Sequence, residues 1–162
     1  MFLIFIKRMG NQHMNNNEEY HEASILIPIS TFIDKERLIK ALHVLSIFQK
    51  LKIVLFHVVE LKSRTSPVEA EFFKSHVDKT KRFLNEIKEW LIKQGYNALV
   101  KVVVARSISE GIIYEANSGD YNIIIMMKRK PRKGVKKLFH KSISEAVIKH
   151  ARKLVLIIPT DF

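Results

Sequence analysis

The sequence contains no cysteine among its 162 residues. This absence excludes disulfide scaffolds, thiolate zinc sites, iron–sulfur clusters and a cysteine nucleophile. A long hydrophobic run is also missing: the best candidate for a membrane segment, residues 1–6, has six apolar residues, whereas a bilayer crossing needs about 20. We therefore expect no transmembrane segment.

Acidic residues are scarce relative to basic ones. The chain has 28 Lys and Arg against 16 Asp and Glu, which gives a net charge of +12. Residues 128–141, which we name the basic loop, hold eight Lys or Arg and no acid. A field of this sign attracts phosphates, nucleic acid or acidic surfaces, although a charged run of this kind also occurs as a plain solvated loop. Because no aromatic ladder accompanies these cations, we do not expect sequence-specific recognition of nucleic acid.

The sequence offers no recognisable catalytic or metal-binding constellation. Its seven histidines lack metal-ligand spacing, and there is no nucleophile–base pair, P-loop or dinucleotide fingerprint. We expect no catalytic residues, no metal site and no enzymatic activity. His57 lies at the end of a predicted strand and is expected to be a hydrogen-bonded structural histidine.

Two hydrophobic periods alternate along the chain from Ala23 onward. Short apolar, β-branched runs predict strands at 24–29, 51–59, 98–104, 123–127 and 154–159, and amphipathic segments between them predict four helices. This alternation is typical of an α/β fold with an open, doubly wound, five-stranded parallel sheet. We expect one domain over residues 23–162, preceded by a flexible tail over residues 1–22, which are polar and without periodicity after residue 8.

Local signals mark the ends of the predicted helices. Capping-box spacing occurs at residues 31–34, 107–110 and 142–145, so Thr31, Ser107 and Ser142 are the expected N-caps. Gly95 stands where a left-handed helix stop is expected. Apolar residues expected on the core faces of the first and last helices include Leu38, Leu42, Val147 and Ile148.

Three parts of the chain carry a family resemblance. Residues 25–28 (Ile-Leu-Ile-Pro), residues 55–59 (Leu-Phe-His-Val-Val) and the block 110–159 occur in the order and spacing of the universal stress protein family. The chain resembles this family over residues 23–162. The resemblance implies a small cytoplasmic dimer that acts in stress regulation, and it implies ATP binding at the carboxyl ends of the strands, where the strand order reverses.

The sequence departs from the motif of the ATP-binding branch of that family. This motif is Gly-x2-Gly-x9-Gly-Ser after the fourth strand, and its glycine positions fall on Lys128, Pro131 and Lys141 when no gap is allowed, while Ser142 matches. Glycines let the backbone approach a phosphate closely, and proline has no amide to donate. The acidic position after the first strand holds Ser30. The resemblance therefore implies a divergent member without the glycine motif.

Three hypotheses for function remain open. The first is a non-enzymatic regulatory or adaptor dimer with weak or no ATP binding. The second is ATP binding in which Lys and Ser side chains replace the glycine cradle, although Ser142 is equally explained as a helix cap. The third is a nonspecific binder of nucleic acid or of an acidic partner through the basic loop. The candidate nucleotide- or anion-binding residues are Ser30, Thr31, Val58, Lys128, Arg129, Lys130, Arg132, Lys133, Lys141, Ser142 and Ser144.

The last predicted strand is apolar throughout and is expected at an edge of the sheet. An exposed apolar edge strand invites pairing with another chain unless it is covered. The family resemblance implies that this strand pairs with its symmetry mate, so we expect an isologous homodimer. The candidate interface residues are Leu154, Val155, Leu156, Ile157 and Ile158.

Overall fold

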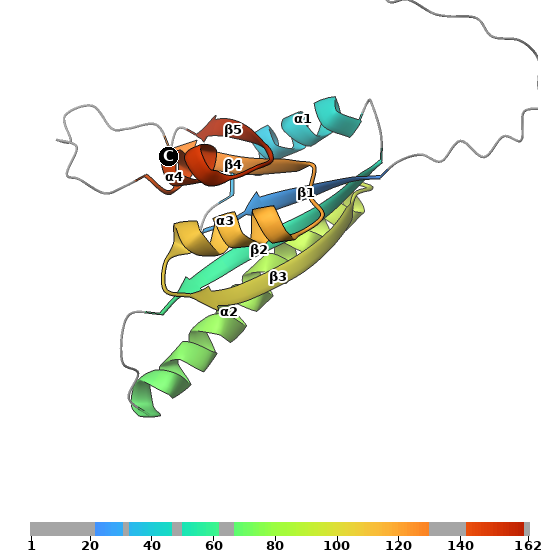
Figure 1. The fold of residues 1–162 in the computed structure, drawn as a ribbon. Helices are drawn as coiled ribbons and strands as arrows, with labels where there is room; N and C mark the ends of the chain where they lie inside the picture. Colours follow the sequence, from blue (N-terminus) through green and yellow to red (C-terminus); the bar gives the residue numbers. More distant parts are fainter. Residues whose placement is uncertain (1–21, 31–32, 47–49, 62–66, 130–141, 161–162) are drawn as a thin grey trace, which may run out of the picture.

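Five parallel strands form a single sheet in the order β3-β2-β1-β4-β5 (Figure 1). The computed structural model describes residues 22–30, 33–46, 50–61, 67–129 and 142–160. The doubly wound parallel sheet predicted from the sequence is confirmed. The strands are β1 (Ala23–Pro28), β2 (Leu51–Glu60), β3 (Asn97–Ala105), β4 (Ile123–Arg129) and β5 (Leu154–Thr160).

The described helices cover the two faces of the sheet in pairs. They are α1 (Lys35–Ser46), α2 (Pro67–Lys93), α3 (Ile108–Ser118) and α4 (Ile143–His150). Residues of α1 and α2 pack in one core cluster, and residues of α3 and α4 pack in a second one on the other side. None of the helices in the described ranges is long and apolar enough to cross a bilayer.

The central strands contribute alternate side chains to the two cores. Ile25 and Ile53 face α1 and α2, whereas Leu26, Val54 and Ile124 face α3 and α4. Successive strand residues point to opposite faces, so a strand covered on both sides needs apolar residues at nearly every position. This requirement explains why β1 and β4 are almost continuously apolar in the sequence.

The shortest strand pairing lies at the point where the strand order reverses. Among the residues that the structure describes, the ladder between β1 and β4 joins only Ile25 with Ile123 and Leu26 with Ile124. By contrast, β1 and β2 pair along all of β1, and β4 and β5 pair along all of β4. Beyond Leu26, β1 and β4 are therefore free to diverge, and the space between their carboxyl ends is where an open α/β sheet binds ligands.

Two of the helix-end signals in the sequence are confirmed. The Ser107 hydroxyl accepts from the Glu110 amide at 3.5 Å, as the capping box predicts. Gly95 has φ of 88°, which confirms the left-handed stop.

The predicted cap of α1 was wrong. The helix begins at Lys35, and the Asp34 carboxylate accepts from the Arg37 amide at 3.1 Å. An aspartate directly before a helix satisfies a free amide of the first turn as well as a threonine does. Thr31, the predicted cap, lies outside the described residues.

The core face of α4 is narrower than the sequence predicted. Val147 is fully buried, but Ile148 is 52% exposed, so its assignment to the core was wrong. Adjacent helical residues are about 100° apart around the axis. A helix of eight residues that packs through Val147 therefore turns the next side chain toward solvent.

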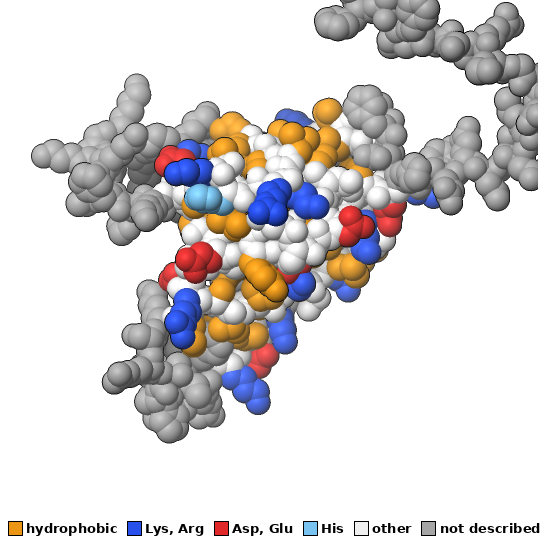
Figure 2. Space-filling model, viewed as in Figure 1, with side chains coloured by type: hydrophobic (Ala, Val, Ile, Leu, Met, Phe, Trp, Pro, Cys, Tyr) orange, Lys and Arg blue, Asp and Glu red, His pale blue; other side chains and the backbone are white. Residues whose placement is uncertain are grey.

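The edge strands differ from the central ones in exposure. On β5, Leu154 is 66% exposed and Leu156 is 37% exposed. They lie on the same face as Ile158, which packs in the α1 and α2 core. Figure 2 shows apolar side chains over α1 and β5 at the upper edge of the view. The prediction that β5 is an apolar edge strand is confirmed.

One carboxylate is buried beneath α3. Glu115 accepts from the Tyr121 hydroxyl at 2.6 Å and forms an ion pair with Lys101 at 2.8 Å. Burial, together with the Glu115 carboxylate, raises the pKa of Tyr121. These bonds join α3 to β3 and to the segment that enters β4. No spacing in the sequence indicates a partner for Glu115, because Lys101 and Tyr121 approach it only in the folded chain.

We predict that Glu115→Ala lowers the free energy of unfolding by about 2 kcal/mol, because the buried Tyr121 hydroxyl loses its acceptor. Lys101 is half exposed and adds little to this loss. The matched control is Glu86→Ala, which removes an exposed carboxylate on α2 and is expected to change stability by less than about 0.5 kcal/mol. Urea unfolding measures both values, and equal losses would contradict a structural role for Glu115.

Candidate functional site

A cavity of about 360 Å³ lies at the carboxyl ends of β1, β2 and β4. The first turns of α3 and α4 close it on one side of the sheet. Its position is the one that the short β1–β4 ladder opens, and its volume falls within the range of small-molecule sites. The lining residues are Pro28, Ile29, Ser30, Phe56, His57, Val58, Ile108, Ile112, Met126, Met127, Lys128, Ser142, Ile143 and Ser144.

The fold brings several sequence-predicted residues together around this cavity. Ser30, Val58, Lys128, Ser142 and Ser144 come from four separate segments and all line it. Arg129 is the last residue of β4, where its backbone pairs with Thr160. The remaining candidates lie outside the described residues, namely Thr31, Lys130, Arg132, Lys133 and Lys141.

Two serine hydroxyls meet at the start of α4. The Oγ atoms of Ser142 and Ser144 are 2.8 Å apart, and Ser144 is buried. Ser142 occupies the N-cap position, but its side chain makes no capping bond, so the expectation that it is a plain helix cap was wrong. The hydroxyl is engaged by Ser144 instead, and the positive end of α4 lies in the cavity wall without that cap.

Lys128 supplies positive charge at the mouth of the cavity. Its Nζ atom is 3.6 Å from a carboxylate oxygen of Glu145, and both side chains are well exposed. An exposed ion pair of this kind contributes little free energy. Little free energy is therefore lost when this contact breaks.

His57 fixes the backbone that leads into the cavity rim. Its Nδ1 is 2.6 Å from the Ile29 carbonyl oxygen, which only accepts, so Nδ1 carries a proton and donates. Strand alternation places the ring on the α1 and α2 side, away from Val58. Burial lowers the pKa of His57, and the bond to Ile29 opposes this effect. The expected structural role of His57 is confirmed, although it lies within β2.

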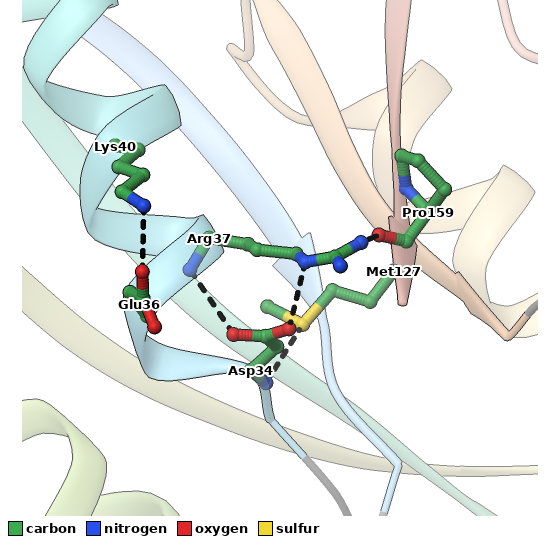
Figure 3. A network of polar contacts seen from close by, with 6 residues as sticks. All are labelled: Asp34, Glu36, Arg37, Lys40, Met127 and Pro159. Atoms are coloured by element: carbon green, nitrogen blue, oxygen red, sulfur yellow. Dashed lines mark hydrogen bonds and ion pairs between the residues drawn. The ribbon is translucent and has the colours of Figure 1, made fainter. Parts of the chain in front are cut away.

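A polar network fastens the start of α1 to the ends of β4 and β5 (Figure 3). The Asp34 amide donates to the Met127 sulfur at 3.4 Å, and the Asp34 carboxylate pairs with Arg37 at 3.3 Å. Arg37 also donates to the Pro159 carbonyl oxygen. Met127 lines the cavity, so this network holds one of its walls in place. Asp34 itself is not among the described residues that line the cavity.

Sequence reasoning missed the apolar walls of the cavity. Phe56 and Met126 contribute from the strands, and Ile108 and Ile112 contribute from α3. Their apolar character was visible in the sequence, but it is the same as that of ordinary core residues. The one usable signal was that α3 begins at the same end of the sheet as the predicted loops.

Within the ranges that the structure describes, no three His, Asp or Glu side chains gather as metal ligands. The cavity instead combines apolar walls with three serine hydroxyls, the first turns of α3 and α4, and one lysine. Such a set suits a ligand with a flat apolar part and an anionic end.

A family comparison agrees with the fold. The model of the universal stress protein family matches residues 24–159. No curated protein matched the sequence.

Solved structures of the same architecture resemble the chain at low identity. The hypothetical protein MJ0577 has a TM-score of 0.70 at 24% identity, covering 85% of this chain and 95% of its own. UspA from Lactobacillus plantarum has a TM-score of 0.66 at 14% identity, covering 84% and 97%. The universal stress protein from Archaeoglobus fulgidus in complex with dAMP has a TM-score of 0.60 at 17% identity, covering 84% and 97%.

We predict that His57 makes stability pH-dependent. Its ordinary pKa is 6.5 and its folded pKa is lower, so below about pH 6.5 the unfolded chain binds a proton that the folded chain does not. The free energy of unfolding therefore falls as the pH drops from about 7.5 to about 5. In His57→Asn, which keeps a donor for Ile29, the fall is shallower. Urea unfolding across this range measures both slopes, and parallel curves would contradict the assignment.

Proposed function

The chain belongs to the universal stress protein family, and from this premise we propose that it is a non-catalytic regulatory module whose cavity binds an adenine nucleotide. The observation that carries the proposal is the cavity at the strand reversal, where Ser142 and Ser144 meet at the start of α4. One structural neighbour of the family is a complex with dAMP, which supports a ligand of this class.

The residues around the cavity fit a nucleotide in two parts. Ile108, Met127 and Ile143 are the partly exposed apolar residues of the lining, and they form the walls against which a base packs. Ser144 and Lys128 stand at the anionic end, where the start of α4 adds its positive dipole. Side chains at the start of α4 and the end of β4 thus take the place of the glycine amides of the family motif.

The proposal also accounts for the departures from the motif. Without the glycines, backbone amides do not surround a phosphate chain closely, so the affinity depends more on charge and falls with salt. The missing carboxylate at Ser30 removes an acceptor for ribose hydroxyls. A regulatory role in the cytoplasm follows if nucleotide binding changes how the surface around the cavity meets a partner.

We predict that Lys128→Ala weakens the binding of AMP and Mg-ATP about fivefold, since an exposed charge contact contributes about 1 kcal/mol. Calorimetric titration of nucleotide-stripped protein at about 0.15 M salt measures the dissociation constants. The matched control is Lys40→Ala, because Lys40 also pairs with a glutamate (Glu36) but lies on α1. Absence of binding to the wild-type protein would contradict the proposal, as would equal effects of the two substitutions.

We also propose that β5 forms an isologous homodimer with a second copy. Within the described part of the chain, the strand presents unpaired backbone along one side, and Leu154 and Leu156 add exposed apolar surface beside it. Pairing two copies through this edge satisfies the unpaired backbone groups and covers the exposed apolar surface. Val155, Ile157 and Ile158 are less exposed, so their contribution to the interface is chiefly through the backbone.

We predict that Leu156→Glu converts the dimer into a monomer. The two introduced carboxylates would repel each other across the two-fold axis, or would lose their hydration when the interface forms. The matched control is Leu99→Glu on β3, which places the same charge on the opposite edge of the sheet. Light scattering after size exclusion measures the mass. A monomeric wild-type protein, or a Leu156→Glu dimer, would contradict this interface.

A further inference from the structure

A second hollow, larger than the cavity, lies between α3 and α4 on the outer surface. Its volume is about 730 Å³, and among the described residues it shares no lining residue with the cavity at the strand ends. We name it the α3/α4 groove. Its lining residues come from α3, from α4 and from the turn after α4.

Hydrogen bonds hold the two walls of the groove together. The Asn117 amide nitrogen donates to the His150 carbonyl at 3.2 Å, and its oxygen accepts from the Arg152 amide at 2.8 Å. The turn after α4 is thus fastened to the end of α3. Because the walls are already fixed, little conformational entropy of this protein is lost when a partner binds in the groove.

The groove carries basic groups at one end. Lys149, His150, Arg152 and Lys153 fall within five residues at the end of α4, and His150 and Arg152 line the groove itself. At the other end, Glu110 lies in the first turn of α3. In the view of Figure 2, which looks onto α3 and α4, Lys and Arg side chains gather in the middle of the face.

The same groove also carries apolar surface. Tyr114 is 75% exposed, and Ile113 and Ala146 also line the groove. A large exposed aromatic residue and an arginine that line one groove are typical of protein interfaces, where both residue types are enriched. The groove therefore offers an apolar strip that is basic at one end.

We propose that the α3/α4 groove docks an acidic peptide segment of a partner protein. Apolar side chains of the segment pack on Tyr114 and Ile113, and its carboxylates face Arg152 and His150. Charge complementarity favours this occupant, because Arg152 in the groove and the neighbouring Lys149 and Lys153 attract carboxylates to this end. Nucleic acid fits less well, because Tyr114 is the only aromatic residue among the described lining residues, and one ring does not form a platform for stacked bases.

Fluorescence anisotropy at about 0.15 M salt tests the proposal with a labelled peptide in which leucines at helical spacing alternate with glutamates. We expect Arg152→Glu to weaken binding at least about tenfold and Tyr114→Ala to weaken it severalfold. The matched control is Lys79→Glu, the same charge change at an exposed site on α2, with an expected change of less than about twofold. The basic loop is unchanged in all of these proteins, so peptide binding to that loop would not cause a difference in affinity between them.

Two further measurements complete the test. Amide chemical shifts of the wild-type protein with the peptide are expected to move at α3 and α4, and Arg152→Gln serves as a second variant if the charge reversal disturbs folding. The proposal is overturned if no peptide binding is detected, or if Arg152→Glu and Lys79→Glu weaken binding equally. It is also overturned if a single-stranded oligonucleotide binds more tightly than the peptide, and if Arg152→Glu weakens the binding of the oligonucleotide but not that of the peptide.

Discussion

The two-residue ladder between β1 and β4 is the constraint on which the rest of the structure depends. Because only Ile25 and Leu26 pair with β4 among the described residues of β1, the two strands are free to separate toward their carboxyl ends. The helices that follow them, α1 and α4, lie on opposite faces of the sheet. The loops and first helical turns that meet at this opening line it. The position of the candidate site therefore follows from the topology of the sheet and does not depend on the polar residues.

Around this opening, polar side chains stand where the family motif has glycine backbone amides. Ser142 gives up a capping bond to pair with Ser144, and Lys128 is held by an exposed contact with Glu145. Because these groups bind one another only weakly, they remain able to bind an anion. The walls are more firmly held, since Met127 is tied to α1 through Asp34 and the backbone at the rim is tied through His57.

Most of the fold could be predicted from the sequence, because burial on both faces forces the apolar runs that mark the strands. The site could be predicted in part: the position of Ser142 and Ser144 follows from topology and family resemblance, but the bond between their hydroxyls depends on rotamers that no spacing reveals. Ile148 was misplaced because a short helix buries a single stripe. Long-range polar contacts, such as that of Glu115 with Tyr121, were invisible because they exist only after folding.

The cavity at the strand reversal is proposed to hold an adenine nucleotide through Ser144 and the start of α4. A crystal structure of the protein grown with AMP tests this most directly, because it locates the ligand without relying on a change in affinity. We expect density for the base against Ile108 and Met127 and for the phosphate beside Ser144 and Lys128. An empty cavity with the nucleotide bound elsewhere on the basic surface would contradict the proposed site.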